Sequence, residues 1–303
     1  MDENDRLFNF NYFGKVLGIL SVCINTFLIL MCSRVKPKPL AKDLKLIMAI
    51  AFVEYLIPFT TLISRIHYYV VGINLIDIDL GCQILGFIVT CAYYYEIQIN
   101  VFLALERLCV VSKIKISKYI YLSIHLNGLI FIGLATYSVT QHLMVPSATK
   151  LICVHSVLNS IIGPVTYFYL VFSFLLGIAI ISYCYYKLAK NILDMDKFVE
   201  LELNSNLNPS ESNRRSKYKK IFIRLNTVLI VYTTCMFGSF LFHLLNGIFH
   251  YIYGHVNPVI LIMNQLGEFL FFIGIIANSC FFLILHSGIA NEVKKSYNRI
   301  KFW

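Results

Sequence analysis

The sequence predicts an all-α membrane protein: a bundle of seven transmembrane helices with a short amphipathic C-terminal helix and an N-terminus outside the cell. The 303 residues are 58% hydrophobic and only 14% charged, whereas soluble domains average about 25% charged residues. Seven apolar stretches are each long enough to cross a hydrocarbon layer of roughly 30 Å. The basic residues lie almost entirely on one side of these stretches, which is typical of membrane proteins.

The predicted spans form a single domain that covers 1–303, with 1–12 as a short outer segment. The spans are 13–33, 43–64, 82–106, 119–144, 157–186, 220–249 and 256–285. The connection between the fifth and sixth spans is the only long polar stretch of the chain. Its Asn, Ser and Pro residues and mixed charge favour a mobile cytoplasmic loop.

Lysine and arginine set the orientation, because cytoplasmic connections carry them in excess. Of the 26 such residues, only Arg6, Lys15, Arg65 and Lys150 lie on the side that holds the N-terminus. We therefore expect the N-terminus outside and the C-terminus in the cytoplasm. The same distribution argues against nucleic-acid binding, which the net charge of +10 alone would suggest in a soluble protein.

The third span is predicted to be the central helix of the bundle. Cys82 and Arg107 lie 25 residues apart, which is about 37 Å along a helix. One helix would thus join a cysteine at the outer surface to an arginine at the inner surface. One face of this helix carries a polar stripe that should face protein rather than lipid. The stripe consists of Tyr93, Glu96, Asn100 and Arg107.

The cysteines predict one disulfide bond. Besides Cys82, only Cys153 lies plainly in an outer connection, and the other seven lie within spans or toward the cytoplasm. Because an oxidising exterior favours disulfide formation, we expect Cys82 to pair with Cys153. The cysteines show no metal-type spacing.

Together these features resemble the rhodopsin-like G-protein-coupled receptors, over essentially the whole chain. The resemblance includes the Glu106-Arg107 pair at the inner end of the third span and the basic amphipathic tail at 287–303. Asn25 resembles the asparagine of the family's first span, and Glu54 stands where the family usually has an aspartate. The sequence NSCFF at 278–282 resembles a degenerate NPxxY motif.

The chain also departs from the family pattern. The sixth span has no proline and no CWxP motif, ERL replaces DRY, and Ser279 replaces the proline of NPxxY. Loose motifs of this kind, together with short termini and many Phe and Tyr residues, most resemble the nematode serpentine chemoreceptors. That resemblance implies a location in the plasma membrane of a sensory cell.

The resemblance implies that the protein binds an extracellular ligand and activates a cytoplasmic G protein through a shift of the sixth span. At the membrane edge, Arg107 can bind a neighbouring acid or carbonyl in a closed bundle and a partner protein in an open one. The implied coupling residues are Glu106, Arg107, Tyr183, Asn278 and Phe282. The basic face of 287–303 suits an anionic inner leaflet.

Buried polar residues indicate a second site near the middle of the membrane, where an ionisable side chain is a functional candidate. Two carboxyl groups close together would share a proton or bind a cation, and the resemblance implies a sodium ion. No other cofactor is expected. The residues of this polar core are Asn25, Glu54, Glu96, Asn100 and Asn278.

The resemblance places the ligand between the outer halves of the third, fifth, sixth and seventh spans. A mostly apolar pocket with few polar groups suits a small molecule, and Glu268 would anchor a cationic one. The candidate residues are Tyr93, Tyr94, Tyr167, Phe168, His243, Asn246, Asn264, Gln265 and Glu268.

Two other functional classes have different requirements. A transporter or channel could pass cations or protons along Glu54, Glu96 and Glu268. An enzyme is not expected, because the sequence contains no HExxH or GxSxG motif and no phosphate-binding glycine loop.

Overall fold

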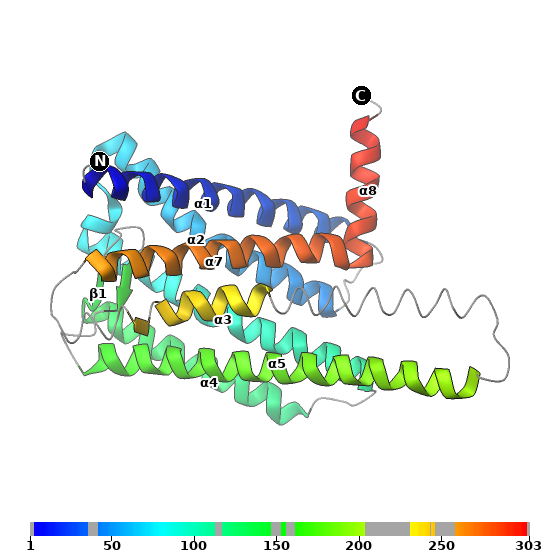
Figure 1. Cartoon of the computed structure of the whole chain (residues 1–303). Helices are drawn as coiled ribbons and strands as arrows, with labels where there is room; N and C mark the ends of the chain where they lie inside the picture. The colour runs from blue at the N-terminus through cyan, green and yellow to red at the C-terminus, as the bar shows by residue number, and fades with distance from the viewer. Residues whose placement is uncertain are drawn as a thin grey trace.

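The molecule is a bundle of long helices that lie side by side (Figure 1). The computed structural model describes residues 3–35, 42–112, 117–146, 153–155, 161–203, 231–242, 244–245 and 258–301. Six helices in these ranges are long and apolar enough to cross a membrane. The chain is therefore an integral, multi-pass membrane protein. The predicted sixth span, 220–249, is described only at 231–242, which is an apolar helix, and at 244–245.

Helices that follow one another in the chain, from α1 to α5, lie in contact, and α3 contacts α2, α4 and α5. The helix Val231–Phe242 packs against both α5 and α7, through Phe240 and Cys235 respectively. The six helices are α1 (Glu3–Arg34), α2 (Lys42–Val71), α3 (Asp79–Ser112), α4 (Lys118–Thr140), α5 (Ile162–Leu203) and α7 (Pro258–Leu285).

Several helices are longer than the apolar stretches that predicted them. Helix α1 begins at Glu3 rather than at residue 13, and α2 continues to Val71 rather than ending at residue 64. At 1.5 Å per residue, α1 is about 48 Å long, whereas the hydrocarbon layer needs only about 30 Å. An apolar stretch marks the part of a helix that lies in lipid, and polar residues continue the same helix outside it.

The largest difference is in α5, which was predicted to end at residue 186 and instead extends to Leu203. The first part of the predicted polar loop is thus helical. Its sequence from 194 to 203, DMDKFVELEL, has no glycine or proline to stop a helix. By contrast, α4 ends at Thr140, earlier than the predicted residue 144, because His142 takes a positive φ of 55° that a helix cannot contain.

The two ends of the bundle differ (Figure 1). One end, here called the hairpin end, holds the N-terminus, the turn Leu75–Asp77 (η1) and two short antiparallel strands, β1 (Met144–Pro146) and β2 (Cys153–His155). Val145 faces Val154 in the ladder. The other end, here called the α8 end, carries α8 (Ser287–Lys301), which runs crosswise to the bundle.

The main core forms where α3 packs against α2, α5, α7 and the helix 231–242. Close approach of α3 and α5 depends on Gly177, because a Cβ atom there would lie 2.6 Å from Cγ1 of Ile97. Lipid-facing side chains remain exposed on the outside of the bundle, among them Leu129 on α4 and Phe172 on α5. This packing leaves the polar stripe of α3 facing protein, as its position at the centre requires.

Candidate functional site

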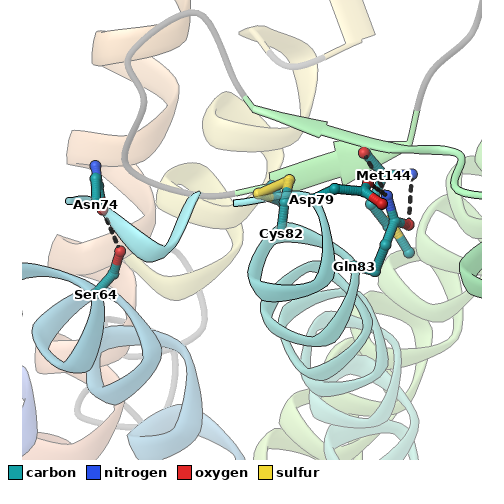
Figure 2. The surroundings of a disulfide bond; sticks show 7 residues. Ser64, Asn74, Asp79, Cys82, Gln83 and Met144 are labelled. Atoms are coloured by element: carbon teal, nitrogen blue, oxygen red, sulfur yellow. Dashed lines mark hydrogen bonds between the residues drawn. A yellow bond between two sulfur atoms is a disulfide. The ribbon is translucent and has the colours of Figure 1, made fainter. Parts of the chain in front are cut away.

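The hairpin end is fastened to α3 at its first turns (Figure 2). Cys82 and Cys153 form the predicted disulfide, with Cα atoms 5.6 Å apart, and the other seven cysteines of the chain are free thiols. The next residue, Gln83, binds the backbone of Met144 at both ends: Nε2 donates to its carbonyl oxygen and Oε1 accepts from its amide, each over 3.0 Å. Both strands of the hairpin are thus held by one turn of α3.

A third contact completes this fastening. His142 Nδ1 lies 2.6 Å from Asp79 Oδ2, and Gln83 Nε2 also donates to Asp79 Oδ1 over 3.0 Å. On the adjacent connection, Ser64 donates a hydrogen bond to Asn74, which fixes the turn between α2 and α3 (Figure 2). The hairpin and the η1 turn are therefore both positioned relative to α3.

Some of the predicted ligand residues meet between α3 and α7. Tyr93 packs against Phe271, with ring centroids 4.3 Å apart. Glu268 lies one turn away on α7 and is only 6% exposed, and Gln265 is half-buried nearby in the same helix. Tyr167 of α5 is half-buried as well. A carboxyl group that is this well buried in an otherwise aromatic region is suited to bind a polar group of a ligand.

Two predicted ligand residues point elsewhere. Tyr94 stacks on Phe131 of α4, with ring centroids 4.0 Å apart, and Phe168 is 59% exposed on the outside of α5. Each follows a half-buried tyrosine, Tyr93 or Tyr167, by one residue, which turns a helical side chain by about 100°. His243 and Asn246 lie outside the described residues, as does the side chain of Asn264.

The residues of the predicted polar core take part in two hydrogen-bonded networks. In the first, Asn278 Nδ2 donates to Glu54 Oε1 over 2.6 Å. The Ser279 hydroxyl lies 3.1 Å from Glu54 Oε2 and 2.7 Å from Oδ1 of Asn25. Asn25 in turn donates to the carbonyl oxygen of Ser21 over 3.1 Å. This network joins α1, α2 and α7.

The second network joins α3 to the helix 231–242. The Tyr232 hydroxyl donates to Glu96 Oε1 over 3.0 Å and accepts from Asn100 Nδ2 over 2.9 Å. Glu54 is completely buried, and Glu96 is 2% exposed. Each acid thus already has protein partners on a different set of helices.

Glu106, Arg107 and Phe282 of the predicted coupling residues lie near the α8 end, whereas Asn278 belongs to the Glu54 network. Arg107 Nη1 donates to the Tyr185 hydroxyl over 2.7 Å, and its guanidinium lies 5.9 Å from the ring centroid of Phe282. Glu106 faces another direction, where Oε1 accepts from the Tyr121 hydroxyl over 2.6 Å and lies 3.8 Å from Lys42 Nζ. The arginine is therefore held by a phenol and an aromatic ring.

The tyrosine predicted next to Arg107 was the wrong one. Tyr183 is 58% exposed, with Lys187 Nζ over its ring. Tyr185, two residues later on α5, is the residue that contacts Arg107. Two helical positions differ by about 200°, so the two side chains lie on nearly opposite faces.

Helix α8 contacts the bundle through part of its apolar face. Ile289 is completely buried, and Val293 packs into the same cluster as Met31 and Ile47 of α1 and α2. Lys294 and Lys295 are exposed on the other side. The helix is thus fixed to the bundle while its basic face stays accessible.

Known proteins resemble this chain in structure and not in sequence. No protein-family model matches the sequence, and no curated protein matches it. The crystal structure of squid rhodopsin is similar, with a TM-score of 0.74 over 99% of this chain and 87% of that chain. The chain has the rhodopsin-like receptor fold. Because the sequences are only 14% identical, the rhodopsin likeness describes the architecture and leaves the ligand open.

Several residues at these sites were not predicted from the sequence, among them Tyr121, Tyr185, Tyr232, Phe271 and Ser279. The chain contains 20 tyrosines, and nothing in an apolar stretch separates those that bind acids from those that face lipid. A signal did exist for Ser279, because it is the serine that replaces the family's proline beside Asn278.

Proposed function

We propose that the protein is a G-protein-coupled receptor that binds a ligand in the outer half of its bundle and activates a cytoplasmic G protein. The rhodopsin-like fold over 99% of the chain is the observation that carries this proposal. The hairpin end, which holds the disulfide, is the extracellular side, because disulfides persist in an oxidising environment. The α8 end, with Arg107 and the basic face of α8, is then cytoplasmic.

The coupling proposal is tested with the purified full chain in lipid nanodiscs, a panel of small molecules and heterotrimeric G proteins. We expect at least one ligand to increase nucleotide exchange, and Arg107→Ala to reduce the stimulated rate about tenfold or more, because a charged hydrogen-bond donor is lost. Tyr183→Phe serves as a matched control, since Tyr183 faces outward. A normal rate in Arg107→Ala would contradict the role of the arginine.

The finer assignment is a chemosensory receptor in the plasma membrane of a sensory cell, of the type found among nematode serpentine receptors. Its support is the loose motif set, in which ERL, Ser279 and the absence of CWxP occur together. We propose an anionic inner leaflet as the surface that contacts Lys294 and Lys295. The rhodopsin-like fold does not favour a transporter or channel, and it suits a receptor rather than an enzyme.

We propose a small cationic ligand that contacts Glu268 and the aromatic pair Tyr93 and Phe271. The buried carboxyl supplies an ionic contact, and the two rings supply apolar and cation–π surface. Glu268→Gln should weaken binding of a cationic agonist about tenfold or more while leaving a neutral agonist unaffected. Concentration–response curves for the two agonists measure this. Equal responses from Glu268→Gln and the unmodified protein would exclude the ionic contact.

We propose sodium as a modulator that binds beside Glu96 and Glu54. If it does, replacing sodium by choline in the buffer should change agonist affinity several-fold, and Glu96→Gln should remove that dependence, because a neutral amide is a weaker ligand for a cation. Glu292→Gln is the matched control, since Glu292 lies on α8, contacts Lys295 and is outside the core. An unchanged sodium and pH dependence in folded Glu96→Gln would rule out this role.

A further inference from the structure

One hydroxyl group fastens the helix 231–242 to α3. The phenol of Tyr232 donates to Glu96 Oε1 and accepts from Asn100 Nδ2, over 3.0 and 2.9 Å. The Asn100 amide is itself oriented, because it also donates to the backbone carbonyl of Glu96 over 3.0 Å. Tyr232, Glu96 and Asn100 are each at most 9% exposed. The three groups thus form a closed and buried arrangement in which each has a defined partner.

Two further contacts of this helix with described residues are apolar. Its Phe240 stacks on Phe174 of α5, with ring centroids 4.6 Å apart, and its Met236 lies against Gly274 of α7. Such apolar contacts depend on close packing and specify no single pair of atoms. A hydrogen bond weakens steeply once its distance and angle change. Among the described residues, the Tyr232 hydroxyl thus supplies the directional contact between this helix and α3.

We propose that Tyr232 is a lock that holds the helix 231–242 against α3 in the closed bundle and that opens when this helix moves. The inference rests on the proposed receptor function, in which a shift of this helix accompanies G-protein activation. The lock lies deep in the bundle and involves other side chains than the contact between Arg107 and Tyr185 near the α8 end. It therefore sets how often the bundle opens without a ligand.

The lock and the proposed sodium site both involve Glu96. The Glu96→Gln substitution distinguishes the two roles. Glu96→Gln removes the charge but keeps an oxygen that accepts from the Tyr232 hydroxyl. It should abolish a sodium effect and retain part of the lock. Glu96→Leu removes the acceptor as well and should release the helix. Tyr232→Phe releases it from the other side, by deleting the hydroxyl while keeping the ring.

The test measures the full chain in nanodiscs in two independent ways. The first is basal nucleotide exchange on a heterotrimeric G protein, without any ligand. The second is the labelling rate of the Cys235 thiol by a membrane-permeant maleimide, read by peptide mass. Cys235 lies on the helix 231–242 and is 8% exposed, so its reactivity reports opening. Cys32, which is completely buried between α1 and α2, is the internal reference.

We expect Tyr232→Phe and Glu96→Leu to raise basal exchange and Cys235 labelling about tenfold, the effect of losing one buried hydrogen bond. Asn100→Leu should act in the same direction. Glu96→Gln should raise Cys235 labelling less than Glu96→Leu does, because it keeps an acceptor for the Tyr232 hydroxyl. Tyr94→Phe is the matched control: the structure places Tyr94 outside the ligand region, and its hydroxyl is a buried polar atom without a hydrogen-bond partner in the described part of the chain. It should change neither readout.

Unchanged Cys235 labelling in Tyr232→Phe would overturn the lock, and so would a Glu96→Gln variant that behaves like Glu96→Leu, since the charge alone would then be responsible. If the labelling rates follow the expected order but no variant drives nucleotide exchange, the lock holds and the proposed receptor function fails. If Tyr232→Phe does not fold, Asn100→Leu decides the matter, because it removes a donor to the same hydroxyl.

Discussion

Replacing Cys82 and Cys153 together by serine should abolish ligand binding and reduce the amount of folded protein at the cell surface severalfold. The disulfide closes a stretch of 71 residues, for which the chain-entropy model gives about 4 kcal/mol. The membrane already restrains α3 and α4 in the unfolded state, so we expect about 2–4 kcal/mol in practice. The larger consequence is local: β2 loses its covalent attachment to α3, and the hairpin no longer has a fixed position over the bundle.

The measurement compares surface expression and thermal unfolding midpoints of the double variant and of Cys91→Ser. Cys91 is a half-buried free thiol on the same helix, so it controls for cysteine replacement in α3. Gln83→Ala should give an intermediate result, because it removes both hydrogen bonds to Met144 but leaves the disulfide. A double variant with normal binding would show that Gln83 and Asp79 position the hairpin without the covalent bond.

The sequence predicts best how deep in the membrane each residue lies. Cys82 and Arg107 are 25 positions apart, so the sequence predicted that they lie at opposite ends of one helix. In the structure both residues belong to α3, and the disulfide is at one end of it. The contact between Glu54 and Asn278 follows similarly, because both lie at the same depth on buried faces. The depth of a residue follows from its position along the helix, because each residue adds about 1.5 Å.

Rotation about a helix axis was harder to predict. Tyr183 and Tyr185, or Tyr93 and Tyr94, lie at nearly the same depth, and only the helical phase distinguishes a residue in the site from one against lipid or another helix. Phase is read from the alternation of apolar and polar residues. In membrane helices that alternation is weak, because lipid and core both favour apolar side chains. The aromatic residues of α5 gave no such signal.

Substituting Glu54 by alanine should be the most damaging single change in the bundle apart from loss of the disulfide. It would leave the Asn278 amide without the acceptor it now has at 2.6 Å, whereas the Ser279 hydroxyl would keep Asn25 Oδ1 at 2.7 Å. A buried group left unpaired costs about 1–3 kcal/mol, and the vacated volume adds to that. We expect a loss of about 2–4 kcal/mol, measured as a lower thermal midpoint by circular dichroism.

Glu54→Gln is the matched variant, and we expect it to be at least as stable as the unmodified protein. The Ser279 hydroxyl has one hydrogen but two oxygens within reach, Glu54 Oε2 and Asn25 Oδ1. A glutamine amide at position 54 can donate to the serine oxygen, so that the serine hydrogen is available to Asn25. Its remaining oxygen accepts from Asn278. If Glu54→Gln were as unstable as Glu54→Ala, the charge of Glu54 rather than its hydrogen bonds would hold α1, α2 and α7 together.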